Sequence, residues 1–217
     1  MAKTLQDWLD WQETLHPCEI DLGLQRVDRV IRQLLPDCYR SDPARFPFTI
    51  ITIAGTNGKG STVALLEAIL CVAGYRVGSY TSPHLLRYNE RIKINQAAVS
   101  DSLICDAFAR IDQARADVSL SYFEFGTLAA IDIMVQQACD IVILEVGLGG
   151  RLDAVNVLDA DISLVTTIDI DHQDWLGSDR NTIALEKAGI YRRNKPAIYG
   201  DNDCPETIKT LVKEQDL

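Results

Sequence analysis

The segment from Thr49 to Ala68 constrains the fold most, because its pattern predicts a strand, a glycine-rich loop and a helix in direct succession. Residues 49–53 are β-branched and apolar, as in a buried strand, and from Ala64 apolar residues recur at helical spacing. Between them lies a loop with three glycines, a lysine and two hydroxyl residues. Such a loop turns tightly, points backbone N–H groups at an anion and adds a positive charge for phosphates. The expected nucleotide-binding residues of this phosphate loop are Gly55, Thr56, Asn57, Gly58, Lys59, Gly60, Ser61 and Thr62.

The spacing within the phosphate loop differs from the common G-x-x-x-x-G-K-[ST] form. Gly55 and Gly58 are three residues apart, and Gly60 separates Lys59 from Ser61. This spacing argues against a plain GTPase or kinase loop. A glycine-rich turn with a solvated lysine is the alternative, and the position between a strand and an apolar helix disfavours it. The motif alone names no reaction, although its hydroxyl groups are suited to hold a Mg²⁺ ion that bridges phosphates.

Composition excludes several classes of protein. The chain has 217 residues, of which 47% are apolar, enough for one large domain or two small ones. A net charge of −10 argues against a nucleic-acid partner. No apolar run approaches the roughly 20 residues of a membrane span, and no signal peptide is visible, so no membrane partner is expected. The six cysteines are widely spaced, which favours a reducing cytoplasmic location.

The order of patterns along the chain predicts an α/β fold with three layers and a mostly parallel sheet, because strands and helices alternate. Further strands are expected at 76–80, 91–94, 140–145, 162–168 and 197–199, with 91–94 as a short edge strand. Helices are expected at 23–35, 100–115, 123–137, 181–188 and 205–213, and a short one after a variant capping box at Thr4 to Asp7. We expect Asp21 to cap the helix at 23–35.

Polar residues follow three of the predicted buried strands. Ser82, Glu145 and the pair Asp171 and His172 each come just after an apolar run. A single carboxylate there can be solvated or paired, and a single histidine is more often a satisfied surface or core residue. Because the carboxyl ends of parallel strands form the ligand crevice of such sheets, their convergence beside a phosphate loop favours a metal site.

Six segments of the chain resemble segments of the folylpolyglutamate synthase family, and they occur in the same order as in that family. They are AGTNGKGST (54–62), TSPHL (81–85), SYFEFGTLAA (121–130), LEVGLGGRLDA (144–154), DHQDWLG (171–177) and EKAGI (186–190). The similarity is greatest to the bifunctional bacterial branch, which is also a dihydrofolate synthase. The family is related to the Mur ligases, and the resemblance therefore implies a Mur-ligase-like ATPase domain.

The resemblance assigns catalytic and metal-binding roles. ATP would bind the phosphate loop through Lys59, and Mg²⁺ would be held by Ser61, Ser82, Glu145 and His172. The implied catalytic residues are Lys59, Glu145, His172 and Lys187. In the family the lysine that matches Lys187 carries a carbamate, whereas the residues alone would place Lys187 on a helix surface.

The resemblance also assigns an acceptor site. The implied pteroate-binding residues are Asp21, Leu22, Gly23, Leu24, Ser121, Tyr122, Phe123, Glu124, Leu152, Asp153 and Ala154. A carboxylate such as Asp153 can bind an aminopyrimidine edge through both oxygens. Phe123 would stack on the flat ring, or serve packing alone, and these two interpretations carry about equal weight.

The implied reaction is ATP-dependent ligation of L-glutamate to dihydropteroate and to folates through an acyl phosphate, with release of ADP and phosphate. A cytoplasmic monomer is expected. Family members are about twice as long, so we expect residues 1–217 to be an incomplete ATP- and pteroate-binding N-terminal domain without a C-terminal Rossmann-like glutamate-binding domain. Weak nucleotide binding and poor turnover are expected of the chain alone. A Mur-type peptide ligase and a non-catalytic nucleotide-binding module are the alternatives.

Overall fold

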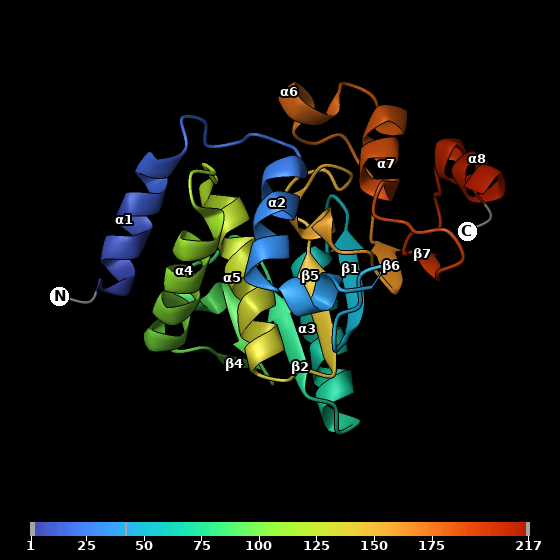
Figure 1. The fold of residues 1–217 in the computed structure, drawn as a ribbon. Helices are drawn as coiled ribbons and strands as arrows, with labels where there is room; N and C mark the ends of the chain where they lie inside the picture. The colour runs from blue at the N-terminus through green and yellow to red at the C-terminus, as the bar shows by residue number, and fades with distance from the viewer. Residues whose placement is uncertain (1–2, 42, 216–217) are drawn as a thin grey trace.

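The chain folds around a seven-stranded sheet with the strand order β4-β3-β2-β5-β1-β6-β7 (Figure 1). The computed structural model describes residues 3–41 and 43–215. The strands are β1 (Thr49–Ala54), β2 (Val77–Tyr80), β3 (Ile92–Ile94), β4 (Ala97–Ala98), β5 (Ile141–Glu145), β6 (Ile162–Val165) and β7 (Ala197–Tyr199). Neighbours from β2 to β7 pair in parallel, whereas β3 runs antiparallel to β2 and β4 antiparallel to β3. The predicted mostly parallel α/β sheet is confirmed.

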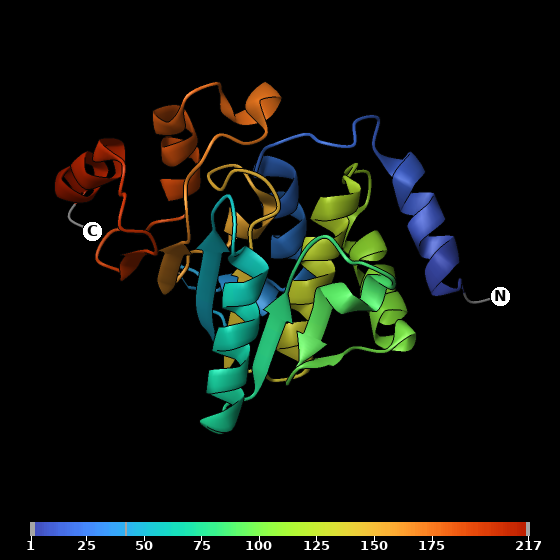
Figure 2. The same ribbon diagram turned by 180° about the vertical axis from the view of Figure 1, so that it is seen from behind.

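Helices cover both faces of the sheet and complete three layers. They are α1 (Leu5–Leu15), α2 (Gln25–Leu34), α3 (Lys59–Val72), α4 (Asp101–Arg115), α5 (Tyr122–Gln136), α6 (Gln173–Leu176), α7 (Arg180–Ala188) and α8 (Glu206–Gln215). Short 3₁₀ turns are η1 (Pro36–Tyr39), η2 (Tyr88–Arg91) and η3 (Ala154–Val157). Helices α2, α4 and α5 lie on one face, with α1 outside α4 and α5, and α3 lies on the other (Figures 1 and 2). Within the described residues, no helix has the length and apolar character needed to cross a membrane.

The central strands are buried on both faces, which explains their continuous apolar sequences. Along β5, Ile143 packs with the cluster under α3, whereas Val142 and Leu144 belong to the larger cluster under α5. Successive side chains of a strand point to opposite faces, and in a parallel sheet covered by helices both faces are dry. α5 is itself buried from Glu124 to Met134, as its apolar positions all round predicted.

The structure confirms one of the two capping predictions and contradicts the other. The capping box of α1 is confirmed: Asp7 N donates to Thr4 Oγ1 at 3.2 Å, and Thr4 N donates to Asp7 Oδ2 at 2.8 Å. The prediction for α2 was wrong, because the helix begins at Gln25 after Leu24, without a side-chain cap. Asp21 instead accepts hydrogen bonds from Arg26 Nη1 at 2.6 Å and pairs with His16 Nε2 at 3.1 Å. These two partners draw its carboxylate away from the helix start.

The expected edge strand at 91–94 is β3, and it is not the edge. β3 pairs with the two-residue strand β4 beyond it. The turn between them, Asn95 and Gln96, has φ values of 48° and 67°, which is the backbone twist that a tight hairpin requires. The sequence carries no glycine there, so the usual hairpin signal is missing. The strand expected at 162–168 ends at Val165, because the next residues bind the phosphate loop instead of a neighbouring strand.

We predict that Leu128→Ala lowers the free energy of unfolding by about 2–5 kcal/mol, because Leu128 is fully buried in α5 and its removal leaves a cavity. The matched control is Leu65→Ala on α3, where the side chain is 62% exposed, and a change within about 0.5 kcal/mol is expected. Urea denaturation of the two variants checks both values. Equal losses would contradict the assignment of the core to the α5 face.

Candidate active site

The carboxyl ends of four neighbouring strands lie at one edge of the sheet (Figure 2), and each is followed by residues expected to be functional. Ser82 lies just past β2, Glu145 ends β5, the phosphate loop follows β1, and His172 follows β6. These strands are consecutive in the sheet and parallel, so their loops share one rim. The expected convergence on one edge is therefore observed at the level of the backbone.

The phosphate loop has the backbone form of an anion-binding site. Gly58 has a φ of 82° and precedes Lys59, the first residue of α3. The first amides of a helix lack acceptors within the helix and lie at the positive end of its dipole, so Lys59, Gly60 and Ser61 present donors to an incoming phosphate. Lys59 Nζ donates to Gly55 O at 2.9 Å, which keeps the ammonium group over the loop.

The residues after β6 hold the phosphate loop in place. Thr56 N donates to Thr167 O at 2.9 Å, and Asn57 N donates to Thr167 Oγ1 at 3.1 Å. Thr166 Oγ1 donates to Asn57 O at 2.6 Å. Gly55 has a φ of 145°, and a Cβ built there would lie 1.8 Å from Thr166 Oγ1. Only glycine fits at this contact, so Gly55 is required by packing as well as by the turn.

Glu145 places a buried carboxylate next to the phosphate loop. The residue is 5% exposed, and a Cβ built on Gly60 would lie 3.9 Å from both of its carboxylate oxygens. Burial raises the pKa of Glu145, against the opposing effects of the Ser82 amide and the Lys59 charge. Among the described residues, the Ser82 N–H at 3.2 Å is its single hydrogen-bond donor. Its oxygens therefore keep lone pairs for a hard cation such as Mg²⁺, and the donor set fits that ion.

The position of His172 does not by itself support the predicted metal site. Its side chain is 53% exposed, its φ is 47°, and its Nε2 lies 3.6 Å from Asp171 Oδ2. In the part of the chain that the structure describes, no hydrogen bond or ion pair joins His172 to Glu145, and no three His, Cys, Asp or Glu residues form a metal-binding group. The structure brings Ser82 and Glu145 together, and the metal-binding role of His172 stays a prediction.

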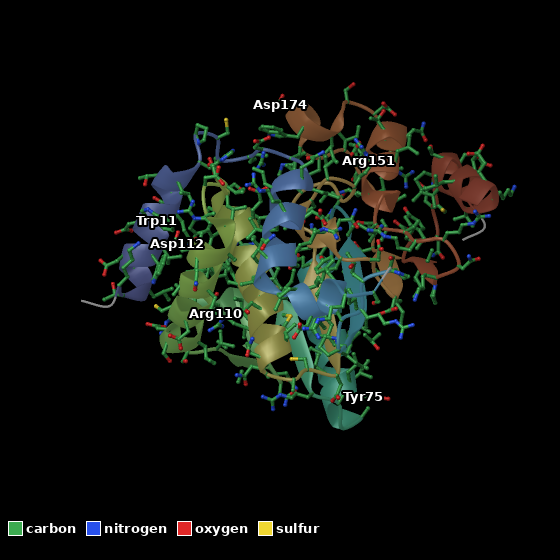
Figure 3. The ribbon with its side chains drawn as sticks, viewed as in Figure 1. Trp11, Tyr75, Arg110, Asp112, Arg151 and Asp174 are labelled. Carbon is green, nitrogen blue, oxygen red and sulfur yellow. The ribbon has the colours of Figure 1, made fainter. Side chains whose placement is uncertain are left out.

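Lys187 is buried, so its surface position expected from the residues alone was wrong. The residue is 3% exposed. Burial, together with the charge of Lys59, lowers the pKa of Lys187 to about 8, and Asp171 opposes this shift. α7 is fixed by the loop after β5: Arg151 N donates to Glu186 O at 2.8 Å, and the side chain of Arg151, which is labelled in Figure 3, forms an ion pair with that of Glu186. This anchoring directs Lys187 inward.

A cavity of about 960 Å³ opens beside Ser82 and His172. Ten of the eleven expected pteroate-binding residues line it, the exception being Leu24, which precedes α2. Gly23 N donates to Leu152 O at 3.2 Å, which joins two segments of the wall that are distant in sequence. The wall also contains residues that the sequence did not single out: Gln12, Glu13, His16, Pro17, Cys18, Glu19, Ile20, Pro83, His84, Arg91, Gly147 and Leu148.

Sequence comparison places these features in a family, although no protein-family model matches the chain. It is 51% identical over 214 residues to the dihydrofolate synthase/folylpolyglutamate synthase of Escherichia coli (strain K12), covering 99% of this chain and 49% of that protein. The protein of the same name from Haemophilus influenzae is 48% identical over 204 residues, with 94% and 45% covered. The chain thus spans about half the length of the curated relatives it matches.

Solved structures agree with the sequence comparison. The structure of Escherichia coli FolC in complex with DHPP and ADP superposes with a TM-score of 0.92 at 49% identity, covering 99% of this chain and 50% of that one. The sequence and fold are those of the folylpolyglutamate synthase family. The Yersinia pestis bifunctional folylpolyglutamate synthase/dihydrofolate synthase with Mn, AMPPNP and L-glutamate bound has a TM-score of 0.87 at 48% identity, with 98% and 50% covered.

The family resemblance stated from six motifs is confirmed, and the structure shows why these motifs occur together. The segment 144–154 ends β5, lines the cavity and packs Gly150 against α7, where a built Cβ would lie 2.7 Å from Glu186 O. Segments 81–85 and 121–130 supply further parts of the wall, and 54–62 is the phosphate loop. Motifs that are far apart in the sequence of this chain thus border a single site.

Asp153 uses both of its carboxylate oxygens within its own loop. Its Oδ2 accepts hydrogen bonds from Gly147 N at 3.0 Å and Leu148 N at 2.8 Å, and its Oδ1 accepts one from Val155 N at 3.0 Å. Burial raises its pKa to about 7, against these backbone donors. A carboxylate that shapes its own loop through both oxygens is not free to bind a ring edge with both. Asp153 lines the cavity, and its binding role stays a prediction.

The aromatic and acidic residues at the start of α5 line the cavity and also stabilise its wall. Phe123 packs against Gly147, where a built Cβ would lie 2.6 Å from the ring, and its centroid is 5.9 Å from that of Tyr80. Packing and a surface for a flat ligand are therefore both present. Glu124 is 3% exposed, completes the Ser121 capping box and pairs with Arg26 at 3.0 Å. Its contacts are structural ones.

We predict that, in buffer freed of CO₂ so that Lys187 is a free amine, its burial makes the protein more stable as pH rises from about 8 to about 10.5. Its folded pKa of about 8 lies below the ordinary lysine pKa of 10.5, so between these values the unfolded state binds more protons. The difference in unfolding free energy between the wild type and Lys187→Met should therefore rise across this window by on the order of 3 kcal/mol. Lys213→Met, at an exposed residue, is the control, and a flat difference for Lys187→Met would contradict the prediction.

Proposed function

We propose that this chain is the ATP- and acceptor-binding part of a ligase that joins L-glutamate to dihydropteroate and to folates. The observation that carries the proposal is the phosphate loop beside the buried Glu145 carboxylate, at the rim of a cavity of about 960 Å³. Relatives with about half of their sequence matched are named for this activity, and their structures hold ADP with DHPP, or AMPPNP with L-glutamate.

Different residues around the phosphate loop would bind the phosphates of ATP and the Mg²⁺ ion. The α3 amides and Lys59 bind the phosphates, and Lys59 offsets the charge that develops during transfer. Glu145, with Ser61, Ser82 and His172, would hold Mg²⁺, which supplies further positive charge to the phosphates when bound. Among these residues Glu145 is buried, and its carboxylate interacts with a cation more strongly there than in water.

The reaction on this proposal has two steps. A carboxylate oxygen of the acceptor attacks the γ-phosphorus of ATP, the bond to the β-γ bridging oxygen breaks, and an acyl phosphate and ADP form. The amine of L-glutamate then attacks the acyl carbon, phosphate leaves, and the amine gives up a proton as the amide forms. The enclosed wall protects the acyl phosphate from hydrolysis.

We further infer that glutamate is bound by a part of the ligase outside these 217 residues, in line with relatives about twice as long. The ligase is proposed to act as a monomer in a reducing cytoplasm. All six cysteines are free thiols, which agrees with that setting. Nucleic acid is not a proposed partner of this acidic chain.

Phosphate release by the full-length ligase tests the function. With ATP, Mg²⁺ and L-glutamate, release is expected with dihydropteroate and with tetrahydrofolate, and not without an acceptor. Lys59→Ala and Glu145→Ala should each lower kcat by roughly 100-fold or more, because Lys59 supplies positive charge to the transferring phosphoryl group and Glu145 would hold the Mg²⁺ that does the same. The control is Lys93→Ala on β3, which is expected to leave kcat unchanged. Release with a nucleotide-linked peptide precursor alone would favour a Mur-type ligase, and nucleotide binding without any release a regulatory module.

We also propose that Lys187 carries a carbamate. A carbamate forms when an uncharged amine adds to CO₂, and a pKa lowered to about 8 by burial supplies that form near neutral pH. With ¹³C-labelled bicarbonate, a slowly exchanging carbamate resonance is expected in the ¹³C spectrum and should be lost in Lys187→Arg. The Lys213→Arg control should keep it. A resonance that persists in Lys187→Arg would contradict the assignment.

A further inference from the structure

The wall of the cavity carries an excess of acidic side chains. It includes Glu13, Glu19, Asp21, Glu124 and Asp153. Among the described residues of the wall, Arg91 is the only lysine or arginine. An acceptor that reacts through a carboxylate must bring a negative charge into this cavity, where acidic neighbours disfavour it. A local cation is therefore needed to hold that carboxylate.

The positive charge of Arg91 is not paired with a carboxylate among the described residues, whereas that of Arg26 is. Arg26 is neutralised by Asp21 at 2.6 Å and Glu124 at 3.0 Å. Arg91 has no ion pair among the described residues, and its Nε donates to His84 Nδ1 at 2.8 Å. Its guanidinium lies 5.5 Å from the ring centroid of Tyr88 and 5.6 Å from that of Tyr122. Two rings and an imidazole thus orient the group, the buried Tyr80 hydroxyl interacts with it as well, and Nη donors remain for a ligand.

His84 completes this arrangement as a neutral imidazole. Because Nδ1 accepts the hydrogen bond from Arg91, the proton of the neutral ring is on Nε2. His84 therefore offers an N–H donor of its own on the cavity wall.

The arginine and histidine are connected to the phosphate loop by a short stretch of chain. Ser82 donates its N–H to Glu145 Oε2 at 3.2 Å, and His84 lies two residues further on. Two residues span about 7 Å at most. Glu145 in turn is next to Gly60 at the start of α3. A carboxylate held by Arg91 is thus close to the place where the phosphates of ATP are expected.

We propose that Arg91, oriented by His84, Tyr88 and Tyr122, binds the carboxylate of the acceptor and sets its direction in the cavity. This inference rests on the proposed function and adds to it a specificity-determining residue. The forked guanidinium matches a carboxylate with two parallel N–H···O bonds, a geometry that lysine cannot reproduce. The acidic remainder of the wall then disfavours the opposite orientation of an anionic acceptor.

The test compares an acid and an amide ligand on variants of the full-length ligase. Dihydropteroate and its carboxamide analogue are titrated by calorimetry into the wild type and into Arg91→Met, which keeps most of the side-chain volume. Arg91→Met should weaken binding of the acid roughly 10- to 100-fold and that of the amide by less than about 3-fold. Arg91→Lys should recover only part of the loss. Lys93→Met is the control, and urea denaturation establishes that each variant is folded.

The outcomes separate this inference from the proposed function. Equal weakening of acid and amide would overturn the role of Arg91 while leaving the acceptor site intact. Absence of binding for both ligands to the wild type would count against the proposed function as well. A parallel titration with tetrahydrofolate locates the carboxylate: an effect on dihydropteroate alone identifies the benzoate carboxylate, and an effect on both identifies the reacting carboxylate of each acceptor. An effect on tetrahydrofolate alone identifies the glutamyl tail.

Discussion

The burial of β5 and β1 on both faces is the constraint on which the rest of the structure depends. A shift of register by one residue would exchange Ile143 with its neighbours between the α3 and α5 faces, and each face accepts a different set of side chains. The register is therefore fixed by packing. Since the strands are parallel, a fixed register also fixes where each one ends, and this brings Glu145 against the start of α3.

The functional edge is built by ending strands early. β6 stops pairing at Val165, and Thr166 and Thr167 use their backbone and hydroxyl groups on the phosphate loop. After β5 the chain turns through glycines around the Asp153 carboxylate. Hydrogen bonds that would otherwise extend the sheet instead order the loops. A loop ordered in this way binds a phosphate with little further loss of conformational entropy.

Sequence periodicity predicted most of the fold, because the buried strands and amphipathic helices satisfy their own local patterns. It failed where a distant partner decides the outcome. Asp21 could be expected to cap α2, but Arg26 and His16 take its carboxylate. Lys187 looks like a surface residue of a short helix until the loop after β5 is packed against it. The contact between Arg91 and His84, seven residues apart, could not be predicted from the sequence. It depends on the return of the chain through η2.

Contacts between residues that are distant in the sequence also determine when the site can form during folding. The hydroxyl groups that hold Asn57 come from residues about 110 positions later, as the sequence separation of 110 between Asn57 and Thr167 shows. Closing so long a loop carries an entropy cost that must be met before its contacts form. A chain growing from the ribosome has its phosphate loop residues early, yet it cannot order them until β6 has been synthesised and has paired. The phosphate loop is therefore ordered late in folding, although its residues lie in the first third of the sequence.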